Sequence, residues 1–530
     1  MAGWNFADVF EAVARTHPGR TALIHGGRRL TWADLDERAA RLAAALEAAG
    51  LRPGDVVAEY LRNGTAYLEA FFAASKAALA PMNTNYRYVA DELEQIWSDA
   101  DVKAVVYDAE FAGTVAAVRD RLPGVRAWLE VGGPESSYER AIAAHPPRPH
   151  GGGSPASLIL IYTGGTTGRP KGVMWRQDDL LSLLNSQNAR PLPDHGGTEA
   201  VRTHLAAQER EVRSLVASPL MHGAGLFYAI SSLASAGTVV TVPGASFSPE
   251  ALLDTLEAER VQGLAIIGDA FARPLLAALD AEPGRWDLGR LRVVFSSGVI
   301  WSGPVKEGLL KHLPKARLLD GLGSSEASSI ASTVSTPGNV ADTASFLPSD
   351  RAAVLHDDGT LAVPGDGRVG RLAVTGWIPV GYLGDPGKSA EVFIEAAGRR
   401  WSVPGDLAVL EADGRIRLLG RGSSCINTGG EKVFAEEVEE ALKTHPGIID
   451  AAVVGVPDER FGAKVVALLV AADGEPDPAA LQAHVRERLA GYKVPRHLGF
   501  VTSLERGANG KLDHRRLTAL AEQRWGTARA

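Results

Sequence analysis

The chain has 530 residues, more than one hydrophobic core usually organises, so its length predicts at least two domains. Hydrophobic residues make up 45% and charged residues 22%, values typical of folded soluble proteins, which excludes global disorder, collagen and a membrane bundle. The formal net charge of -8 provides no basic surface for a phosphate backbone, so we expect no nucleic-acid partner.

The cysteine usage and the apolar runs indicate the compartment. A single cysteine, Cys425, excludes an internal disulfide framework and a cysteine-based metal cluster, and it suits a reducing environment. Asp8 and Glu11 precede the first basic residue and no long apolar core follows, so we expect no secretory signal. The apolar run at residues 465–472 is far shorter than the roughly 20 residues of a membrane helix. The sequence therefore predicts a cytoplasmic protein without a membrane span.

The first part of the chain alternates extended segments with amphipathic helices. In residues 31–50, Thr31 is placed to cap a helix and Gly50 to end it. Similar strand and helix units continue to about Gly298. This alternation predicts an α/β fold with parallel strands and crossover helices.

A stretch rich in glycine and threonine, YTGGTTGRPKGVMW at residues 162–175, follows an apolar run. Glycines let backbone N–H groups approach a ligand, threonines add hydroxyl donors and Lys171 adds a positive charge, which together suit a polyphosphate. The common P-loop pattern has Ser or Thr after its lysine, whereas Gly172 stands here. Taken alone, such a stretch is as often a surface loop. Its place after a buried strand favours a phosphate-binding loop of another type.

Two changes of pattern divide the rest of the chain. After about Gly359, short strands with turn signals predict a small β subdomain. From Glu436, a pattern of helices and strands predicts a compact α+β module. We therefore expect a large N-terminal domain at residues 1–421 and a small C-terminal domain at residues 422–530.

Six stretches occur in the order typical of the adenylate-forming superfamily, which the chain resembles over nearly its whole length. They are the loop above, PLMHGAG (219–225), GLGSSEA (321–327), WSVPGD (401–406), LLGRGSSCINTGGEKVFAEEVEEAL (418–442) and GANGKLD (507–513). The segments GVMWRQDD, GDAFARPLL and INTGGEKV look most like actinobacterial fatty-acyl and sterol-acyl CoA synthetases. The resemblance implies an ATP- and acid-binding N-terminal domain and a mobile C-terminal domain that carries a catalytic lysine.

The resemblance also implies a nucleotide site. It implies that the loop cradles the β- and γ-phosphates of ATP, that Asp406 accepts the ribose hydroxyls and that Arg421 closes over ribose and α-phosphate. Leu322 stands where an aromatic residue that stacks on adenine is usual, and Gly430 lies near the coenzyme A tunnel. The full nucleotide and coenzyme set implied is Thr163, Gly164, Gly165, Thr166, Thr167, Gly168, Lys171, Gly298, Leu322, Ser325, Asp406, Arg421 and Gly430.

Four residues form the catalytic set that the resemblance implies: Lys511, Glu326, Lys171 and His222. Glu326 resembles the acid that holds Mg²⁺, and Lys511 the lysine that stabilises negative charge as a carboxylate attacks the α-phosphate. His222 resembles a gate between the acid pocket and the ATP site. Taken alone, a lone glutamate and a tail lysine are usually surface residues, and such a histidine is as often a packing residue.

We therefore expect a ligase that uses ATP and Mg²⁺ to adenylate a small-molecule acid and then transfers the acyl group to coenzyme A. The pocket should contain Phe227, Tyr228, Phe271 and Trp301 among small residues, which favours an apolar or aromatic acid. One alternative is activation without coenzyme A, either as a diazotase that adenylates nitrite for an arylamine or with a carrier protein or amine as acceptor. Another is a non-catalytic nucleotide-binding protein. A homodimer is common among similar enzymes.

Overall fold

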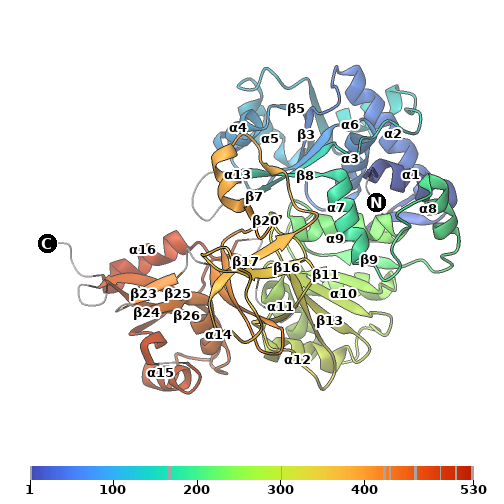
Figure 1. The fold of residues 1–530 in the computed structure, drawn as a ribbon. Coiled ribbons are helices and arrows are strands. Elements are labelled where there is room, and N and C mark those ends of the chain that lie inside the picture. The colour runs from blue at the N-terminus through green and yellow to red at the C-terminus, as the bar shows by residue number, and fades with distance from the viewer. Residues whose placement is uncertain are drawn as a thin grey trace.

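The computed structural model describes residues 3–163, 170–299, 301–421, 425–428, 431–458, 462–489, 491–507 and 510–526. Its strands form three sheets with helices packed around them, which confirms the predicted α/β architecture (Figure 1). Within these ranges, no helix is both long and apolar enough to cross a membrane.

The first sheet has seven strands in the order β18-β8-β7-β4-β3-β5-β6. In chain order, its strands are β3 (Val56–Tyr60), β4 (Ala80–Asn83), β5 (Val102–Asp108), β6 (Ala127–Val131), β7 (Leu158–Thr163), β8 (Lys171–Arg176) and β18 (Gly381–Tyr382). β7, β4, β3, β5 and β6 are parallel, whereas β8 pairs antiparallel with both β7 and β18. The carboxyl ends of β3, β4 and β7 therefore meet at one edge of the sheet.

The second sheet joins fifteen strands. Six run parallel: β1 (Thr21–His25), β10 (Thr238–Thr241), β9 (Arg213–Val216), β11 (Gly263–Ile266), β12 (Val293–Ser297) and β13 (Arg317–Leu322). The others pair antiparallel: β2 (Arg28–Thr31), β14 (Ala331–Ser335), β15 (Ser345–Pro348), β16 (Ala352–Leu355), β17 (Gly370–Thr375), β19 (Phe393–Ala396), β20 (Arg399–Ser402), β21 (Asp406–Leu410) and β22 (Ile416–Arg421). The predicted small β subdomain is thus continuous with the parallel strands through β15.

The third sheet belongs to the C-terminal module, drawn in red in Figure 1. Its strands are β23 (Cys425–Thr428), β24 (Glu431–Phe434), β25 (Ile448–Asp458), β26 (Gly462–Ala471) and β27 (His497–Phe500). Phe434 forms a small buried cluster with Val409 and Leu419 of β21 and β22. This cluster joins the C-terminal module to the second sheet.

The helices pack on these sheets. The first eight are α1 (Phe6–Thr16), α2 (Trp32–Ala48), α3 (Thr65–Lys76), α4 (Ala90–Asp99), α5 (Ala112–Arg119), α6 (Ser137–Ala144), α7 (Gln177–Ser186) and α8 (Gly197–Ala206). The next eight are α9 (Gly223–Ala234), α10 (Pro249–Ala258), α11 (Gly268–Ala281), α12 (Gly303–His312), α13 (Pro386–Val392), α14 (Ala435–Lys443), α15 (Pro478–Arg486) and α16 (His514–Trp525). The main core cluster includes apolar residues of α1, α2, α3, α7 and α9.

The predicted helix after Thr31 is confirmed as α2. The Thr31 hydroxyl accepts a hydrogen bond from Asp34 N, and the Asp34 carboxylate accepts one from Thr31 N at 2.9 Å, so both halves of a capping box are present. The helix ends at Ala48, two residues before Gly50, which has φ +91°.

We expect Thr31→Ala to lower the free energy of unfolding by about 1 kcal/mol, because it leaves helix N–H groups without a side-chain acceptor. Urea unfolding followed by circular dichroism measures this change. Thr203→Ala, at an exposed interior position of α8, is the matched control. Equal losses in the two variants would contradict a capping role.

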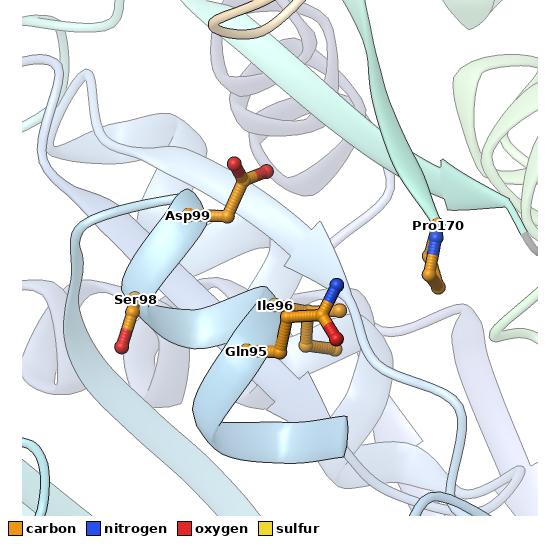
Figure 2. A pocket seen from close by; sticks show the side chains of 5 residues that line it. All are labelled: Gln95, Ile96, Ser98, Asp99 and Pro170. Atoms are coloured by element: carbon orange, nitrogen blue, oxygen red, sulfur yellow. The ribbon is translucent and has the colours of Figure 1, made fainter. Parts of the chain in front are cut away.

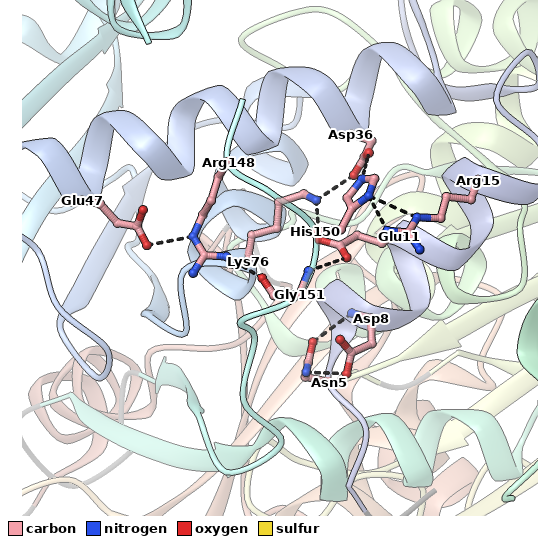
Figure 3. Close-up of polar contacts among 10 residues, drawn as sticks. All are labelled: Asn5, Asp8, Glu11, Arg15, Asp36, Glu47, Lys76, Arg148, His150 and Gly151. Atoms are coloured by element: carbon pink, nitrogen blue, oxygen red, sulfur yellow. Dashed lines mark hydrogen bonds and ion pairs between the residues drawn. The ribbon is translucent and has the colours of Figure 1, made fainter. Parts of the chain in front are cut away.

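A buried ion cluster joins α1, α2 and α3 (Figure 3). The Lys76 ammonium lies 2.6 Å from a Glu11 carboxylate oxygen and 2.7 Å from one of Asp36. His150 contacts Asp36 at 2.7 Å, and Gly151 N donates to Glu11. Glu11, Asp36 and His150 are close enough together to suggest a metal site, but the cation between the two carboxylates is Lys76. The contacts also fix the connecting segment that precedes β7.

Candidate active site

The predicted phosphate loop connects two paired strands. β7 and β8 are antiparallel and place Thr163 directly opposite Lys171. Gly164, Gly165, Thr166, Thr167 and Gly168 lie outside the described residues. The strand β8 is not predicted from the sequence.

Gly172 has a packing reason to follow Lys171. A Cβ atom at this position would lie 2.6 Å from the ring of Tyr162, so only glycine lets that ring cross the hairpin. The Tyr162 hydroxyl in turn donates to Asp99 at 2.6 Å. Gly172, which stands where a P-loop has Ser or Thr, therefore makes room for the ring of Tyr162.

Lys171 and Glu326 approach the same tyrosine. The Lys171 ammonium is 2.5 Å from an Asp385 oxygen and 5.5 Å from the centre of the Tyr382 ring. The Tyr382 hydroxyl donates to Glu326 Oε1 at 3.0 Å. The hydrogen bond from Lys171 lowers the pKa of Asp385. The structure thus joins the predicted phosphate lysine to the predicted metal ligand through β18.

Glu326 lies in the connection between β13 and β14. The Ser402 hydroxyl donates to Glu326 O at 2.6 Å, and Trp175 Nε1 donates to Ser325 O at 2.9 Å. These bonds tie the connection to β20 and β8. The Glu326 side chain is partly exposed. An oriented carboxylate of this kind is the hard oxygen ligand that Mg²⁺ prefers, so the residue present fits a magnesium ion.

The predicted ribose residues begin and end neighbouring strands. Asp406 starts β21 and pairs with Arg421 at the end of β22. The Arg421 side chain and Gly430 lie outside what the structure describes. Leu322, the last residue of β13, is partly buried and packs against the main core. Gly298 follows β12 with φ +97°, which favours glycine at this position.

His222 precedes α9 and is brought close to the C-terminal module. Burial, with smaller contributions from the charges of Lys511 and Arg87, lowers the pKa of His222 to about 4. A Cβ atom at Gly510 would contact Val299 at 3.1 Å and Ala270 at 3.5 Å, so the turn before Lys511 packs on the N-terminal residues beside β12 and α11. The structure therefore brings Lys511 toward His222 from the opposite end of the sequence.

The turn that carries Lys511 is fixed within its own module. Arg506 forms an ion pair with Asp450 at 2.6 Å and donates to Gly510 O at 2.9 Å. Gly507 N also donates to Lys511 O at 2.9 Å. These contacts orient the backbone of the turn independently of the lysine side chain.

The lowered pKa of His222 predicts a pH dependence of stability. The unfolded chain binds a proton on His222 below about pH 6.5, but the folded chain does so only below about pH 4. Protonation therefore favours unfolding as pH falls through this window. Between pH 7 and pH 4, we expect His222→Gln to lose about 2 kcal/mol less unfolding free energy than wild type, allowing for partial exposure.

Denaturant unfolding of both proteins at several pH values measures this difference. The comparison is needed because other groups titrate in the same range. His195→Gln, at an exposed position, is the control and should retain the wild-type profile. Parallel profiles for wild type and His222→Gln would show that His222 titrates normally in the folded chain.

The aromatic residues predicted for the acid pocket differ in exposure. Trp301 is completely buried, with its ring 5.7 Å from the Lys306 ammonium, and Phe227 and Phe271 are 7% and 8% exposed. Tyr228 is partly exposed, and its ring stacks on Phe295 at 5.6 Å. Of the four predicted aromatic residues, Tyr228 is the most exposed.

A hollow of about 390 Å³ lies beside the phosphate hairpin (Figure 2). It is lined by Gln95, Ile96, Ser98 and Asp99 of α4 and by Pro170. None of these residues belongs to the predicted site. Asp99 also accepts the hydrogen bond from the Tyr162 hydroxyl. The hollow therefore borders the residue that holds Tyr162, directly before the phosphate loop.

Sequence reasoning missed Tyr382, Asp385 and Arg87. Asp385 carries a local signal, since it precedes Pro386 and caps α13 by accepting a hydrogen bond from Lys388 N. Its pairing with Lys171 crosses 214 residues and has no local signal. Arg87 lies two residues after Asn85 in the connection after β4. Its backbone N donates to the Asn85 side chain.

Comparisons with known proteins find family matches and relatives over most of the chain. Residues 10–380 match the family model of the AMP-binding enzyme, and residues 437–511 match that of the AMP-binding enzyme C-terminal domain. The chain is 38% identical to the medium-chain acyl-CoA ligase Mig of Mycobacterium avium, over 96% of each chain. It is 39% identical to a 3-oxocholest-4-en-26-oate–CoA ligase of Rhodococcus rhodochrous, over 96% of this chain and 95% of that one.

A solved structure shows the same fold over nearly the whole chain. It is the anthranilate CoA ligase AuaEII in complex with anthranoyl-AMP, with a TM-score of 0.84 and 23% identity. The alignment covers 98% of each chain.

Proposed function

The chain belongs to the AMP-binding enzyme family, and from this premise we propose that it is an AMP-forming acyl-CoA ligase. It adenylates an apolar or aromatic carboxylic acid with ATP and Mg²⁺ and transfers the acyl group to coenzyme A. The observation that carries the proposal is the contact of Lys171 and Glu326 with one residue, Tyr382, while Lys511 approaches His222.

In the first half-reaction, a carboxylate oxygen of the acid attacks the α-phosphate and the bond to pyrophosphate breaks. Lys171 places a positive charge at the base of the phosphate loop, and Lys511 stabilises the negative charge that develops. Glu326 would hold Mg²⁺, which when bound neutralises phosphate charge. His222 stays neutral at pH 7 because its pKa is lowered, so it adds no charge beside the reacting carboxylate.

In the second half-reaction, the thiol of coenzyme A attacks the acyl carbon, loses its proton and displaces AMP. The proposal assigns Asp406 and Arg421 to the ribose and Gly430 to the coenzyme A tunnel. It divides the chain into domains at residues 1–421 and 422–530. This division is supported by β22, which belongs to the second sheet, and by β23, which belongs to the third.

The proposed substrate is an apolar or aromatic carboxylic acid. Medium-chain and sterol acids are named for the two curated relatives, and anthranoyl-AMP for the solved structure. Tyr228, stacked on Phe295, gives the acid an aromatic surface. The proposal also includes a cytoplasmic location and a homodimer. Light scattering of the purified protein measures the molar mass and so tests the homodimer.

Pyrophosphate release from ATP and Mg²⁺ tests the proposal. The panel contains fatty, aryl and sterol acids, and nitrite with an arylamine, each with and without coenzyme A. Turnover of one carboxylic acid class with formation of its CoA thioester is the expected result. Turnover of nitrite and amine alone, unaffected by coenzyme A, would identify a diazotase instead, and no turnover with any acid would overturn the proposal.

A further inference from the structure

We propose that Asn83 is a positioning residue that couples the strand before the phosphate loop to the turn that carries His222. The inference rests on the proposed function and adds a residue to it. Asn83 is the last residue of β4 and is 4% exposed. It lies at the edge where the carboxyl ends of β3, β4 and β7 meet.

The first contact continues the sheet. β4 and β7 pair through Met82 and Leu160. Beyond that pair, the Asn83 side-chain amide bonds the backbone of β7 as the backbone of a paired strand would. Its Nδ2 donates to Tyr162 O at 3.1 Å, and its Oδ1 accepts from Tyr162 N at 2.6 Å. Both backbone polar groups of Tyr162 are thus held by one amide, one residue before Thr163.

The second contact reaches the other half of the N-terminal domain. Asn83 Nδ2 also donates to Met221 O at 2.5 Å, directly before His222. A side-chain amide has two N–H donors, and both are directed to carbonyl groups here. Because Asn83 is buried, water cannot easily replace these bonds, and each one lost leaves a buried polar group unpaired. One side chain therefore sets the spacing between Tyr162 and Met221.

Tyr162 has little freedom to adjust if this support is lost. Its ring crosses Gly172 in the opposite strand, and its hydroxyl is bonded to Asp99. A change at Asn83 should therefore move Tyr162 and the hairpin together rather than be absorbed locally. Small displacements of positioning groups can cost about 10²-fold in rate.

Asn63 provides a matched control. It also holds the turn before His222, because it accepts from Leu220 N at 2.7 Å and donates to Val216 O and Ser218 O. These three partners all belong to residues 216–220. Loss of Asn63 should therefore disturb the histidine turn, whereas loss of Asn83 should disturb the phosphate loop as well.

The test compares Asn83→Ser with Asn63→Ser by KM and kcat for ATP–pyrophosphate exchange, by ATP affinity from calorimetry and by Tm. We expect Asn83→Ser to raise KM and Kd for ATP about tenfold and to lower kcat by about 10- to 100-fold. Asn63→Ser should leave both ATP constants within about twofold of wild type. An unchanged ATP affinity in Asn83→Ser would overturn the proposal, and so would equal changes in both variants.

Asn83→Asp tests the same idea in a variant of nearly identical shape. A protonated carboxyl group can still accept from Tyr162 N and donate to one carbonyl, whereas the ionised form cannot donate. Burial beside carbonyl oxygens should raise its pKa. At a temperature where both proteins are folded, the activity of Asn83→Asp relative to wild type should therefore rise as pH falls. A ratio independent of pH would contradict the hydrogen-bond assignment.

The measurements separate the two proposals. If wild type shows no exchange with any acid, the proposed ligase function fails, and calorimetry with ATP still decides the role of Asn83. If wild type is active and Asn83→Ser has the same ATP constants as wild type, the role of Asn83 fails and the ligase function stands.

Discussion

Lys511→Ala is expected to lower the rate of acyl-adenylate formation by about 10²- to 10³-fold, the cost of removing a donor that stabilises developing negative charge. The turn before this lysine packs on Val299 and Ala270 through Gly510, and its charge contributes to the lowered pKa of His222. The backbone of the turn is held by Arg506, so truncation should leave the fold intact. ATP–pyrophosphate exchange measures the first half-reaction directly.

The second half-reaction distinguishes a role of Lys511 in adenylation from a structural role. Isolated acyl-adenylate is supplied with coenzyme A, and thioester formation is followed. Because adenylation is then bypassed, Lys511→Ala should keep a rate close to that of wild type. Arg515→Ala, an exposed cation four residues away, is the matched control and should retain both activities. Equal losses in both half-reactions would show that Lys511 supports the structure rather than the attack on the α-phosphate.

The sequence predicts the elements of the site better than their contacts. The run before the loop is continuously apolar and the helix after Thr31 is amphipathic, so both are recognised, and they appear as β7 and α2. The strand β8 is as long as β7 but is not recognised, because its first residues, Lys171 and Gly172, look like the end of the glycine-rich stretch rather than an apolar run. It is nevertheless the strand that places Lys171 opposite Thr163.

Side-chain direction is the part that the sequence does not specify. Trp301 follows a strand end and was expected in the acid pocket, but its ring is fully buried close to Lys306. Tyr382 is unremarkable in the sequence, yet its hydroxyl reaches Glu326 across 56 residues. Asn83 looks like an ordinary polar residue at a strand end. The roles of these residues depend on packing between elements that are distant in the chain.

Glu326→Gln is expected to lower adenylation by about 10²-fold or more, because it replaces an anionic metal ligand with a neutral amide of the same shape. The amide oxygen can still accept the hydrogen bond from Tyr382, so the connection between β13 and β14 should keep its conformation. The loss should therefore appear in metal dependence. Calorimetry of ATP binding with Mg²⁺ and with EDTA measures it without turnover.

For wild type, ATP should bind more tightly with Mg²⁺ than with EDTA, and for Glu326→Gln the two affinities should converge. Glu307→Gln, on the exposed side of α12, removes the same charge away from the site and should keep the wild-type difference. Tyr382→Phe should lie between the two, because it removes the hydroxyl that orients Glu326 but retains the ring beside Lys171. A wild-type response to Mg²⁺ in Glu326→Gln would mean that another group holds the ion. The contacts of Lys171 and Glu326 with Tyr382 would then serve only to orient the phosphate loop.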